Sequence, residues 1–210
     1  MIGLGRFGSA LADTLIDMGH EVMGLDANAD IVQEASLRLD HAAQINATNI
    51  NALEQIGAKH FPIAVVGIGD DVEASILTTA ALSDLGIRSI WAKAITQSHG
   101  RILERVGAHH VVFPEHDMGQ RVAHLLTGRM MDYMELDESF AIVETTAPAE
   151  MVGKSLRDTQ IRKRHEVTVV CVKPAGETFT YATPETVINA DDVLLIAGET
   201  PRVTKFAELS

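Results

Sequence analysis

The segment that most constrains this chain is a glycine motif at its start, Gly3-Leu4-Gly5-Arg6-Phe7-Gly8. It has the G-x-G-x-x-G spacing and opens an apolar-patterned helix that we expect over residues 9–18. Glycines at these spacings allow a tight turn from strand to helix, close approach of backbone N–H groups to a phosphate, and close packing of the helix on its sheet. A phosphate bound there would lie at the positive end of the helix dipole. The motif therefore predicts a nucleotide-binding βαβ unit.

An acidic residue after the next strand strengthens this prediction. Asp26 follows a strand expected over residues 21–25, close to the spacing of about 20 residues at which a carboxylate accepts hydrogen bonds from an adenosine ribose. A carboxylate there would repel a 2′-phosphate, so NADP is disfavoured and NAD(H), ATP, ADP and AMP stay as candidate ligands. Only Met1 and Ile2 precede the glycines, so we expect the first strand to be nearly absent and the N-terminus to be clipped.

The first half of the chain repeats one local pattern, an amphipathic helix that ends at a glycine and leads into a short β-rich run. A left-handed helix C-cap is expected at Gly19, Gly57, Gly86 and Gly107. Strands are expected over residues 21–25, 42–47, 63–68, 89–94 and 110–113. This alternation predicts a parallel sheet covered by helices on both faces. With the truncated first strand, the sheet has six strands, as in a complete doubly wound, Rossmann-like α/β fold.

The αβ alternation ends after one more amphipathic helix, expected over residues 117–127. Residues 128–133 break the pattern, so we expect a nucleotide-binding domain over residues 1–132 and a second domain over residues 133–210. The second domain is expected to contain a strand at 140–144, a helix at 156–164, strands at 168–173, 178–182 and 193–197, and a helix at 201–207. This β-α-β-β-β-α unit is a small α+β domain, and we expect it to be stabilised by pairing with a copy of itself.

Composition excludes several classes of function. The formal net charge of −12 argues against a nucleic-acid partner, since phosphate binding needs a basic face and none is concentrated here. No apolar segment approaches the roughly 20 residues of a membrane span, and the N-terminus lacks the pattern of a signal peptide. A membrane role would therefore come through a partner. Cys171 cannot form an internal disulfide, which fits a reducing cytoplasm.

In a doubly wound sheet the ligand lies at the carboxyl ends of the strands. Besides Asp26, the residues expected there are Asn46-Ala47-Thr48, Ile68-Gly69, Lys93 and Glu115. For Asn46-Ala47, an adenine contact and a role beside the cap of the following helix weigh equally. Lys93 interrupts an apolar run, and we interpret it as a phosphate contact. Glu115 is either an acid at a helix N-terminus or the ligand of a cation that bridges to a phosphate.

The other polar residues receive simpler interpretations. Arg6 stands beside the expected phosphates, with which a guanidinium pairs in a forked geometry. Asp70 and Asp71 are interpreted as helix N-caps, Trp91 as a core residue, and the 9 histidines as unliganded. No set of residues suggests bond-making chemistry, so we expect that the chain is not an enzyme. The alternative is a small NAD-dependent oxidoreductase or redox sensor, which would share the Rossmann-like domain.

Several segments together resemble the cytoplasmic regulators of potassium conductance, the RCK proteins of the KtrA and TrkA type, in which a TrkA-N domain precedes a TrkA-C domain. The segments that carry the resemblance are the glycine motif, Asn46-Ala47-Thr48, Trp91-Ala92-Lys93-Ala94, Gly107-Ala108-His109-His110-Val111-Val112-Phe113-Pro114-Glu115 and Val152-Gly153-Lys154-Ser155-Leu156. The resemblance covers the whole chain. It implies a cytoplasmic, nucleotide-sensing subunit, dimeric through its N-domains and assembled into an octameric ring, that gates a separate potassium channel or transporter of the TrkH or KtrB type at the membrane.

The resemblance also implies a binding site. ATP, ADP or NAD(H) would occupy the Rossmann cleft, with Arg6 reaching the nucleotide phosphates and Glu115 near them and near a cation such as magnesium at the dimer interface. The helix expected over residues 117–127 matches the family's crossover helix, which swaps onto the partner subunit. Some relatives bind cyclic di-AMP between paired C-terminal domains, at positions that would include Arg162 and Thr168. Thr168 stands where an asparagine is common, which argues against this second ligand.

Overall fold

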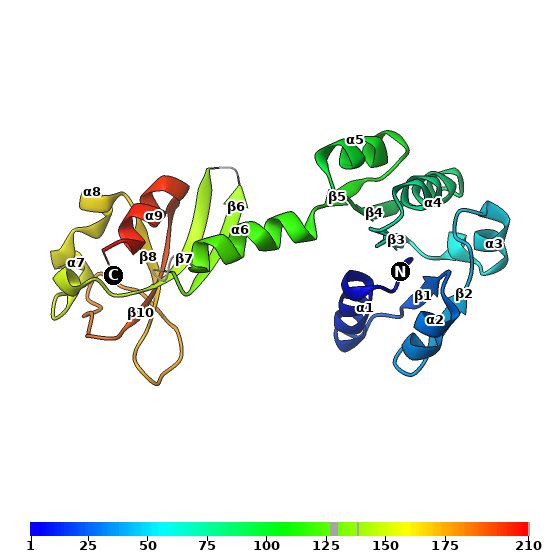
Figure 1. The fold of residues 1–210 in the computed structure, drawn as a ribbon. Helices are drawn as coiled ribbons and strands as arrows, with labels where there is room; N and C mark the ends of the chain where they lie inside the picture. The colour runs from blue at the N-terminus through cyan, green and yellow to red at the C-terminus, as the bar shows by residue number, and fades with distance from the viewer. Residues whose placement is uncertain (127–129, 138, 210) are drawn as a thin grey trace. The chain divides into compact units, whose positions relative to one another are not determined.

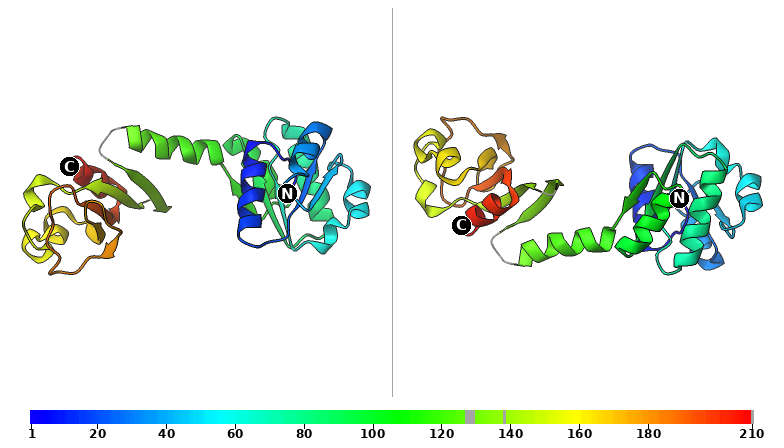
Figure 2. Two further views of the ribbon diagram at one scale, coloured as in Figure 1. Left: turned by 90° about the horizontal axis from the view of Figure 1, so that it is seen from below. Right: turned by 90° about the horizontal axis from the view of Figure 1, so that it is seen from above.

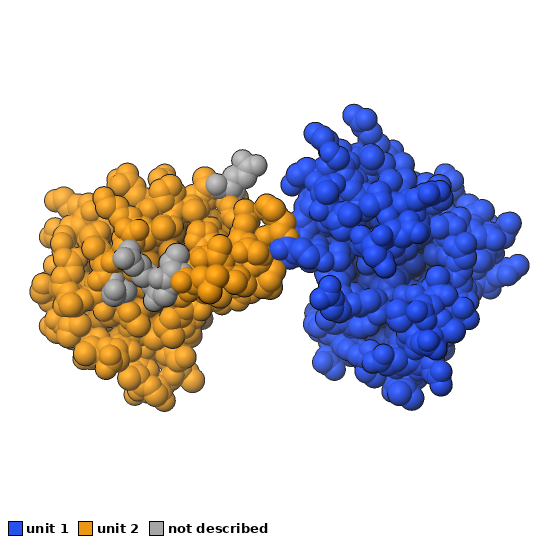
Figure 3. Space-filling model, viewed as in Figure 1, with its two compact units in different colours: residues 1–115 blue, residues 116–210 orange. Residues whose placement is uncertain are grey.

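The computed structural model describes residues 1–126, 130–137 and 139–209 of the chain. These residues form two compact units, Met1–Glu115 and His116–Ser210 (Figure 3). Each unit has its own hydrophobic core, so each is described by itself. Within the described residues, no helix is both long enough and apolar enough to cross a membrane.

The first unit alternates short strands with helices in the expected order (Figure 1). Its helices are α1 (Arg6–Asp17), α2 (Ala29–Ala35), α3 (Ile50–Gln55), α4 (Val72–Asp84) and α5 (Gln97–Arg105), with a short 3₁₀ turn η1 (Ala58–His60). Its strands are β1 (Met23–Asp26), β2 (His41–Gln44), β3 (Ile63–Val66), β4 (Ser89–Lys93) and β5 (His110–Val112). Gly19, Gly57, Gly86 and Gly107 all have positive φ angles after their helices, which confirms the predicted left-handed C-caps.

The strands of this unit pair in parallel, β1 with β2 on one side and β3 with β4 and β5 on the other. Ile2 joins the two groups, because it forms parallel bridges to both Leu25 and Val66. The strand order is therefore β2-β1-Ile2-β3-β4-β5, which places the first strand at the switch point of a doubly wound sheet. The Rossmann-like fold with a nearly absent first strand is confirmed.

Helices cover both faces of this sheet, although unevenly. Helices α4 and α5 lie on the opposite side of the sheet from α1 (Figure 2), and two separate apolar clusters pack on the two sides. Helix α1 begins at Arg6 rather than at residue 9, because Gly5 already has the extended backbone of an N-cap. Arg6, Phe7 and Gly8 are therefore helical, and the motif itself forms the first turn.

The second unit begins with helix α6 (Pro114–Leu126), whose first two residues belong to the first unit. Proline suits the first turn of a helix because its missing N–H would be unpaired there in any case. The predicted end of this helix at Thr127 lies outside the described residues, as do Gly128 and Arg129. The domain division after residue 132, which assigns this helix to the nucleotide-binding domain, stays a prediction.

The rest of the second unit is an antiparallel sheet with short helices, in the strand order β6-β7-β10-β8-β9. Its elements are β6 (Asp132–Asp137), β7 (Phe140–Thr146), η2 (Ala149–Met151), α7 (Leu156–Thr159), α8 (Ile161–His165), β8 (Thr168–Lys173), β9 (Thr180–Tyr181), β10 (Val193–Glu199) and α9 (Thr200–Ala207). Strands β7 and β10 bury alternate residues beneath α9, whose Val203 and Phe206 are fully buried. The expected α+β unit is thus present.

Two details of this unit differ from the sequence prediction. Strand β6 was not expected, because four of its six residues are exposed at the sheet edge and its apolar signal is weak. The single helix expected over residues 156–164 is two short helices, α7 and α8. They are separated at Gln160, whose φ of 49° ends the first helix.

Candidate functional site

The three glycines of the motif have three different structural roles. Gly3 turns the chain with a φ of 84°, a conformation that other residues rarely adopt. A Cβ atom at Gly8 would stand 1.9 Å from the carbonyl oxygen of Gly3, so this glycine lets α1 pack directly on the loop. A Cβ atom at Gly5 would meet no protein atom within 4 Å. The space in front of Gly5 is therefore open, and this is the place where a ligand can approach the backbone.

The N-terminus of α1 is suited to an anion. Its N-cap Gly5 provides no side-chain acceptor, and the first turn contains no acidic residue. The first N–H groups of a helix need acceptors, and they carry the positive end of its dipole. Arg6 adds a cation to this same end, which is unfavourable for the isolated helix. Both features become favourable when a phosphate or another anion lies in front of Gly5.

Asp26 connects the end of β1 to the glycine loop. Its Oδ2 accepts a hydrogen bond from the Leu4 N–H at 2.7 Å, and its Oδ1 accepts one from the Asn28 N–H at 2.9 Å. Each carboxylate oxygen keeps a further lone pair, so Asp26 can also accept from the hydroxyl groups of a ribose. The carboxylate therefore both orders the loop and faces the cavity beside it.

A cleft of about 340 Å³ runs along the carboxyl ends of the strands. Several predicted site residues line it, namely Gly3, Gly5, Asp26, Asn46, Ala47 and Ile68. Leu4 and Gly8 are buried under the loop instead and support it from below. A volume of this size lies in the range of small-molecule sites, which is roughly 300–1,000 Å³.

The cleft is also lined by residues that the sequence interpretation did not assign to the site. Asp71 caps α4 by accepting from the Ala74 N–H at 2.9 Å, as predicted, but Asp70 and Asp71 also line the cleft. Gly67 lines it as well and packs against the loop, since a Cβ atom there would stand 3.1 Å from the oxygen of Gly3. The available signal was a second G-x-G segment, Gly67-Ile68-Gly69, which follows an apolar strand directly and precedes Asp70.

Four further predicted residues gather in a second group. The Lys93 ammonium donates to Glu115 Oε1 at 2.5 Å and lies 5.8 Å from the centre of the Phe7 ring. A Cβ atom at Gly69 would come within 3.0 Å of Lys93 Nζ. Lys93 is only 9% exposed, so it needs a partner, and Glu115 provides the opposite charge. Lys93, Glu115, Phe7 and Gly69 therefore form a small cluster around one ion pair.

Electrostatics link this cluster to the start of α1. The pKa of Glu115 lies below its ordinary value, chiefly because of the hydrogen bond from Lys93, and the positive charge of Arg6 contributes to the same shift. Burial acts in the opposite direction but does not outweigh the hydrogen bond. No cluster of three or more metal-ligating side chains occurs among the described residues. Glu115 as a metal ligand therefore stays a prediction that needs donors from phosphate, water or a second chain.

Trp91 is not the core residue that the sequence suggested. Its side chain is 37% exposed and stacks on His110, with ring centroids 4.1 Å apart. Alternate residues of β3 and β4 face α4 and are buried, so Trp91 and the exposed Ile63 lie on the other face of the sheet. The part of that face around Ile63 and Trp91 therefore carries exposed apolar side chains.

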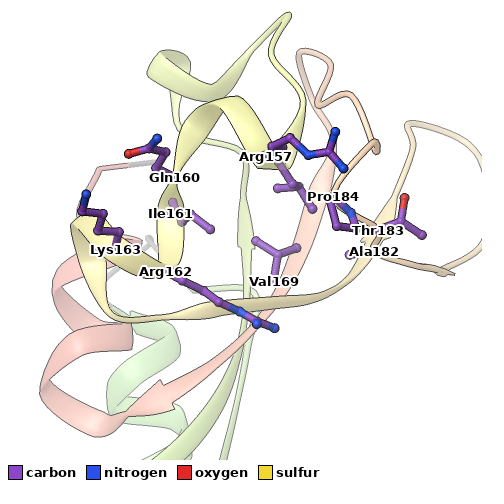
Figure 4. Close-up of a pocket in the computed structure, with 10 residues that line it drawn as sticks. Arg157, Gln160, Ile161, Arg162, Lys163, Val169, Ala182, Thr183 and Pro184 are labelled. Carbon is purple, nitrogen blue, oxygen red and sulfur yellow. The ribbon is translucent and has the colours of Figure 1, made fainter.

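The second unit contains a pocket of about 370 Å³ (Figure 4). Helices α7 and α8 contribute Arg157, Arg162 and Lys163, and apolar residues such as Ile161 and Val169 line the rest. Arg162 Nε donates to the Thr168 hydroxyl at 3.1 Å, which holds the guanidinium beside β8. Basic groups around an apolar floor suit an anionic ligand that also has a flat apolar part.

Comparisons with known proteins agree with this architecture. A family model of the TrkA-N domain matches residues 1–114, and one of the TrkA-C domain matches residues 140–210. The chain is 35% identical over 207 residues to the Ktr system potassium uptake protein C of Bacillus subtilis (strain 168), covering 98% of this chain and 94% of that protein. It is also 35% identical over 207 residues to the Ktr system potassium uptake protein A of the same organism, and that match covers 98% of this chain and 93% of that protein.

A solved structure described as the GsuK channel bound to NAD matches the fold with a TM-score of 0.68 and 18% sequence identity. The match covers 99% of this chain and 38% of that chain. The curated relatives are named as potassium uptake proteins. The predicted resemblance to proteins in which a TrkA-N domain precedes a TrkA-C domain is thus confirmed, and the relatives are not named as dehydrogenases, which share the Rossmann-like sheet.

Proposed function

We propose that this chain, which belongs to the TrkA-N and TrkA-C domain family of potassium uptake proteins, is a nucleotide-sensing subunit that gates a potassium-transporting membrane protein. The observation that carries the proposal is the open space in front of Gly5, at the uncapped N-terminus of α1 and beside Asp26. A side chain could occupy that space without any clash, so the glycine is explained by a ligand rather than by the protein's own packing.

An adenosine nucleotide fits the groups that line the cleft. A diphosphate would lie at the backbone N–H groups around Gly5, the ribose at Asp26, and the base between Asn46-Ala47 and Ile68. ATP, ADP and NAD(H) share these three parts. The GsuK channel, a protein of the same fold, is bound to NAD in its structure, which supports a nucleotide in this chain's cleft.

The cluster around Lys93 gives the cleft a means to distinguish nucleotides. A γ-phosphate lies beyond the two phosphates that the loop binds, so side chains or a magnesium ion must neutralise it. Arg6 stands at the start of α1, and Glu115 is already held by Lys93. A third phosphate would recruit Arg6 directly and Glu115 through magnesium, which gives ATP and ADP different contacts. A ligand shifts a switch only through such differential contacts.

Exposed apolar surface supports assembly with further copies of the chain. Helix α6 has no buried residue, and its Met118 and Val122 are 53% and 41% exposed. The face of the first unit around Ile63 and Trp91 is apolar and exposed as well. We assign both surfaces to contacts within a dimer and an octameric ring. The ring would lie in the cytoplasm and attach to the membrane through a partner of the TrkH or KtrB type.

Although Thr168 stands where an asparagine is common, it holds Arg162 beside the pocket of the second unit, and this pocket supports a second candidate ligand, cyclic di-AMP. Arg157, Arg162 and Lys163 offer charge for its two phosphates, and the apolar floor offers surface for its bases. Arg162→Ala should abolish binding of cyclic di-AMP in a calorimetric titration while leaving ADP binding unchanged. Heat of cyclic di-AMP binding that is equal in both proteins would exclude this pocket.

Calorimetric titration of the full chain with ATP, ADP and NADH, each with and without magnesium, tests the main proposal. We expect saturable binding of one nucleotide per chain. Incubation of the NADH complex with small carbonyl compounds is the companion measurement, since a regulator binds the cofactor without turnover. Absence of binding by all three nucleotides, or steady oxidation of NADH, would contradict the proposed function.

A further inference from the structure

The first turn of helix α5 is closed by a histidine. Thr96 is the N-cap, and its Oγ1 accepts a hydrogen bond from the His99 N–H at 3.1 Å. The His99 ring reaches back along the chain, where its Nδ1 accepts from the Ile95 N–H at 3.4 Å. This arrangement is similar to a capping box, in which a glutamate or glutamine at the third helical position supplies the second acceptor. Here the bond goes to the residue before the cap, and the acceptor is an imidazole.

Only the neutral ring of His99 can make this bond. A backbone N–H can only donate, so Nδ1 carries no proton and the single proton of the neutral ring is on Nε2. Nε2 is buried and has no hydrogen-bond partner among the residues that the structure describes. A second proton would therefore remove the acceptor for Ile95 and create a cation that no described residue receives.

The surroundings of His99 also oppose that proton. The residue is 3% exposed, and burial lowers the pKa of its ring below the ordinary histidine value. It lies in the first turn of α5, where the positive end of the helix dipole is unfavourable for a cation. The charged or titratable residues on the elements that pack on α5, and on α5 itself, are Glu73 and Asp84 of α4, Lys93 of β4, His110 of β5, and Arg101, Glu104 and Arg105. None of them contributes to the lowered pKa of His99.

The turn that His99 holds lies beside the proposed nucleotide site. It follows β4, which ends at Lys93. A Cβ atom at Gly69 would stand 3.0 Å from Lys93 Nζ and 3.7 Å from Ile95 Cγ2. Gly69 itself stands between Ile68 and Asp70, and both of these residues line the cleft. A change at the Ile95 N–H therefore reaches the cleft through the contacts of Gly69.

We propose that His99 is a proton-sensitive positioning residue of the nucleotide site. At neutral pH its ring holds the turn after β4 beside the cleft, and in mild acid its protonation releases that turn and weakens nucleotide binding. The inference rests on the proposed function, because it takes a nucleotide to occupy the cleft. It adds pH as a second input to the response of this chain to nucleotides.

Two variants keep an acceptor at this position but take up no proton in mild acid. In His99→Asn, the Oδ1 atom is as many bonds from the backbone as Nδ1 of the histidine. In His99→Gln, the residue is one that an ordinary capping box contains. If one of the two variants fails to fold, the other one keeps the comparison possible. The exposed His20 provides the matched control, since His20→Asn removes an imidazole of the same unit from a different place.

The test is a set of calorimetric titrations of the full chain with ADP at about pH 7.5 and about pH 5.5, on either side of the ordinary histidine pKa of about 6.5. Between these two conditions, the Kd of the native chain should rise by a factor about threefold or more larger than that of the His99 variants, the order of one lost hydrogen bond. The protonation of ADP itself is common to all the proteins and cancels in this comparison. His20→Asn should follow the native chain.

Melting temperatures of the same proteins without ligand test the cap separately from the nucleotide. Because the pKa of His99 is lower in the folded chain than in the unfolded chain, the stability of the native chain should fall as the pH falls below about 6.5. The native chain should therefore lose more of its melting temperature on acidification than His99→Asn or His99→Gln.

Two results would overturn the inference, namely an equal loss of melting temperature in the native chain and the His99 variants, or an equal pH dependence of their ADP affinity. Absence of ADP binding at both pH values would overturn the proposed function and the claim about binding with it. The melting temperatures would then still decide whether the cap of α5 is proton-sensitive.

Discussion

Replacement of Gly5 by alanine separates ligand binding from folding. The backbone of Gly5 has φ −65° and ψ −171°, which alanine adopts freely, and the added methyl group meets no protein atom within 4 Å. Alanine is a poorer N-cap than glycine, which costs about 0.5–1 kcal/mol of stability. Alanine also lowers the conformational entropy of the unfolded chain, which stabilises the folded state by about 0.4–1 kcal/mol and offsets that cost. The free energy of unfolding should therefore change by less than about 1 kcal/mol.

The affinity for nucleotides should fall much further. The methyl group occupies the space where a diphosphate would accept from the N–H groups of α1. Loss of one hydrogen bond to a charged acceptor costs about 1.5–3 kcal/mol, which is roughly a ten- to hundredfold rise in Kd. Calorimetric titration with ADP measures the affinity, and thermal unfolding of the same sample measures the stability.

Two other glycine variants provide the controls. A methyl group at Gly8 would stand 1.9 Å from the Gly3 oxygen, so Gly8→Ala should destabilise the first unit by about 1–3 kcal/mol or more. Gly119 lies in α6, where a Cβ atom also meets nothing within 4 Å, so Gly119→Ala should leave nucleotide affinity unchanged. A folded Gly5→Ala protein that binds ADP as tightly as the native chain would refute the reasoning.

Four further outcomes are expected. Asp26→Ala should weaken ATP, ADP and NADH by a similar factor of about ten to a hundred in calorimetry, because the ribose is common to all three. Arg6→Ala should weaken ATP more than ADP in titrations with magnesium, and equal losses would assign Arg6 to the shared diphosphate. Lys93 lowers the pKa of Glu115, so the stability that Glu115 contributes is complete above the ordinary glutamate pKa of about 4.3 and is lost as the pH falls through the lower pKa of the folded state. The difference in melting temperature between the native chain and Glu115→Gln should therefore shrink with acidification. A difference that stays constant would be inconsistent with the ion pair. Light scattering should give more than one subunit's mass at micromolar concentration, and Val122→Glu on α6 should lower that mass; a monomeric native chain would contradict the ring.

Much of the first unit could be predicted because its signals are local. Each left-handed C-cap of this unit is a glycine, and each parallel strand is a short apolar run in the sequence. Gly8 is required by its close backbone contact with Gly3. The early start of α1 at Arg6 was missed because an N-cap glycine has no side-chain signal. The pattern therefore located the elements better than their ends.

The pairing of side chains was less predictable, because it depends on contacts between distant segments. The sequence predicts a phosphate contact for Lys93, but it does not show that Glu115 lies beside this residue once β4 and α6 are in place. Trp91 lies in an apolar run, but it is on the face of β4 opposite the buried Ile90 and Ala92, where its side chain stays exposed. The left-handed Gln160 has no sequence signal, since this conformation is typical of glycine and asparagine rather than glutamine.

The most direct test of the account measures potassium uptake into vesicles that contain a Ktr-type membrane protein, with this chain added together with ATP, ADP or no nucleotide. We expect the rate of uptake with the native chain to differ between ATP and ADP. With Gly5→Ala the difference between the two rates should disappear at nucleotide concentrations that only just saturate the native chain, because the variant binds about ten- to hundredfold more weakly while the fold is kept. Equal rates with the native chain under nucleotide concentrations that saturate it in calorimetry would contradict the claim that this cleft controls potassium transport.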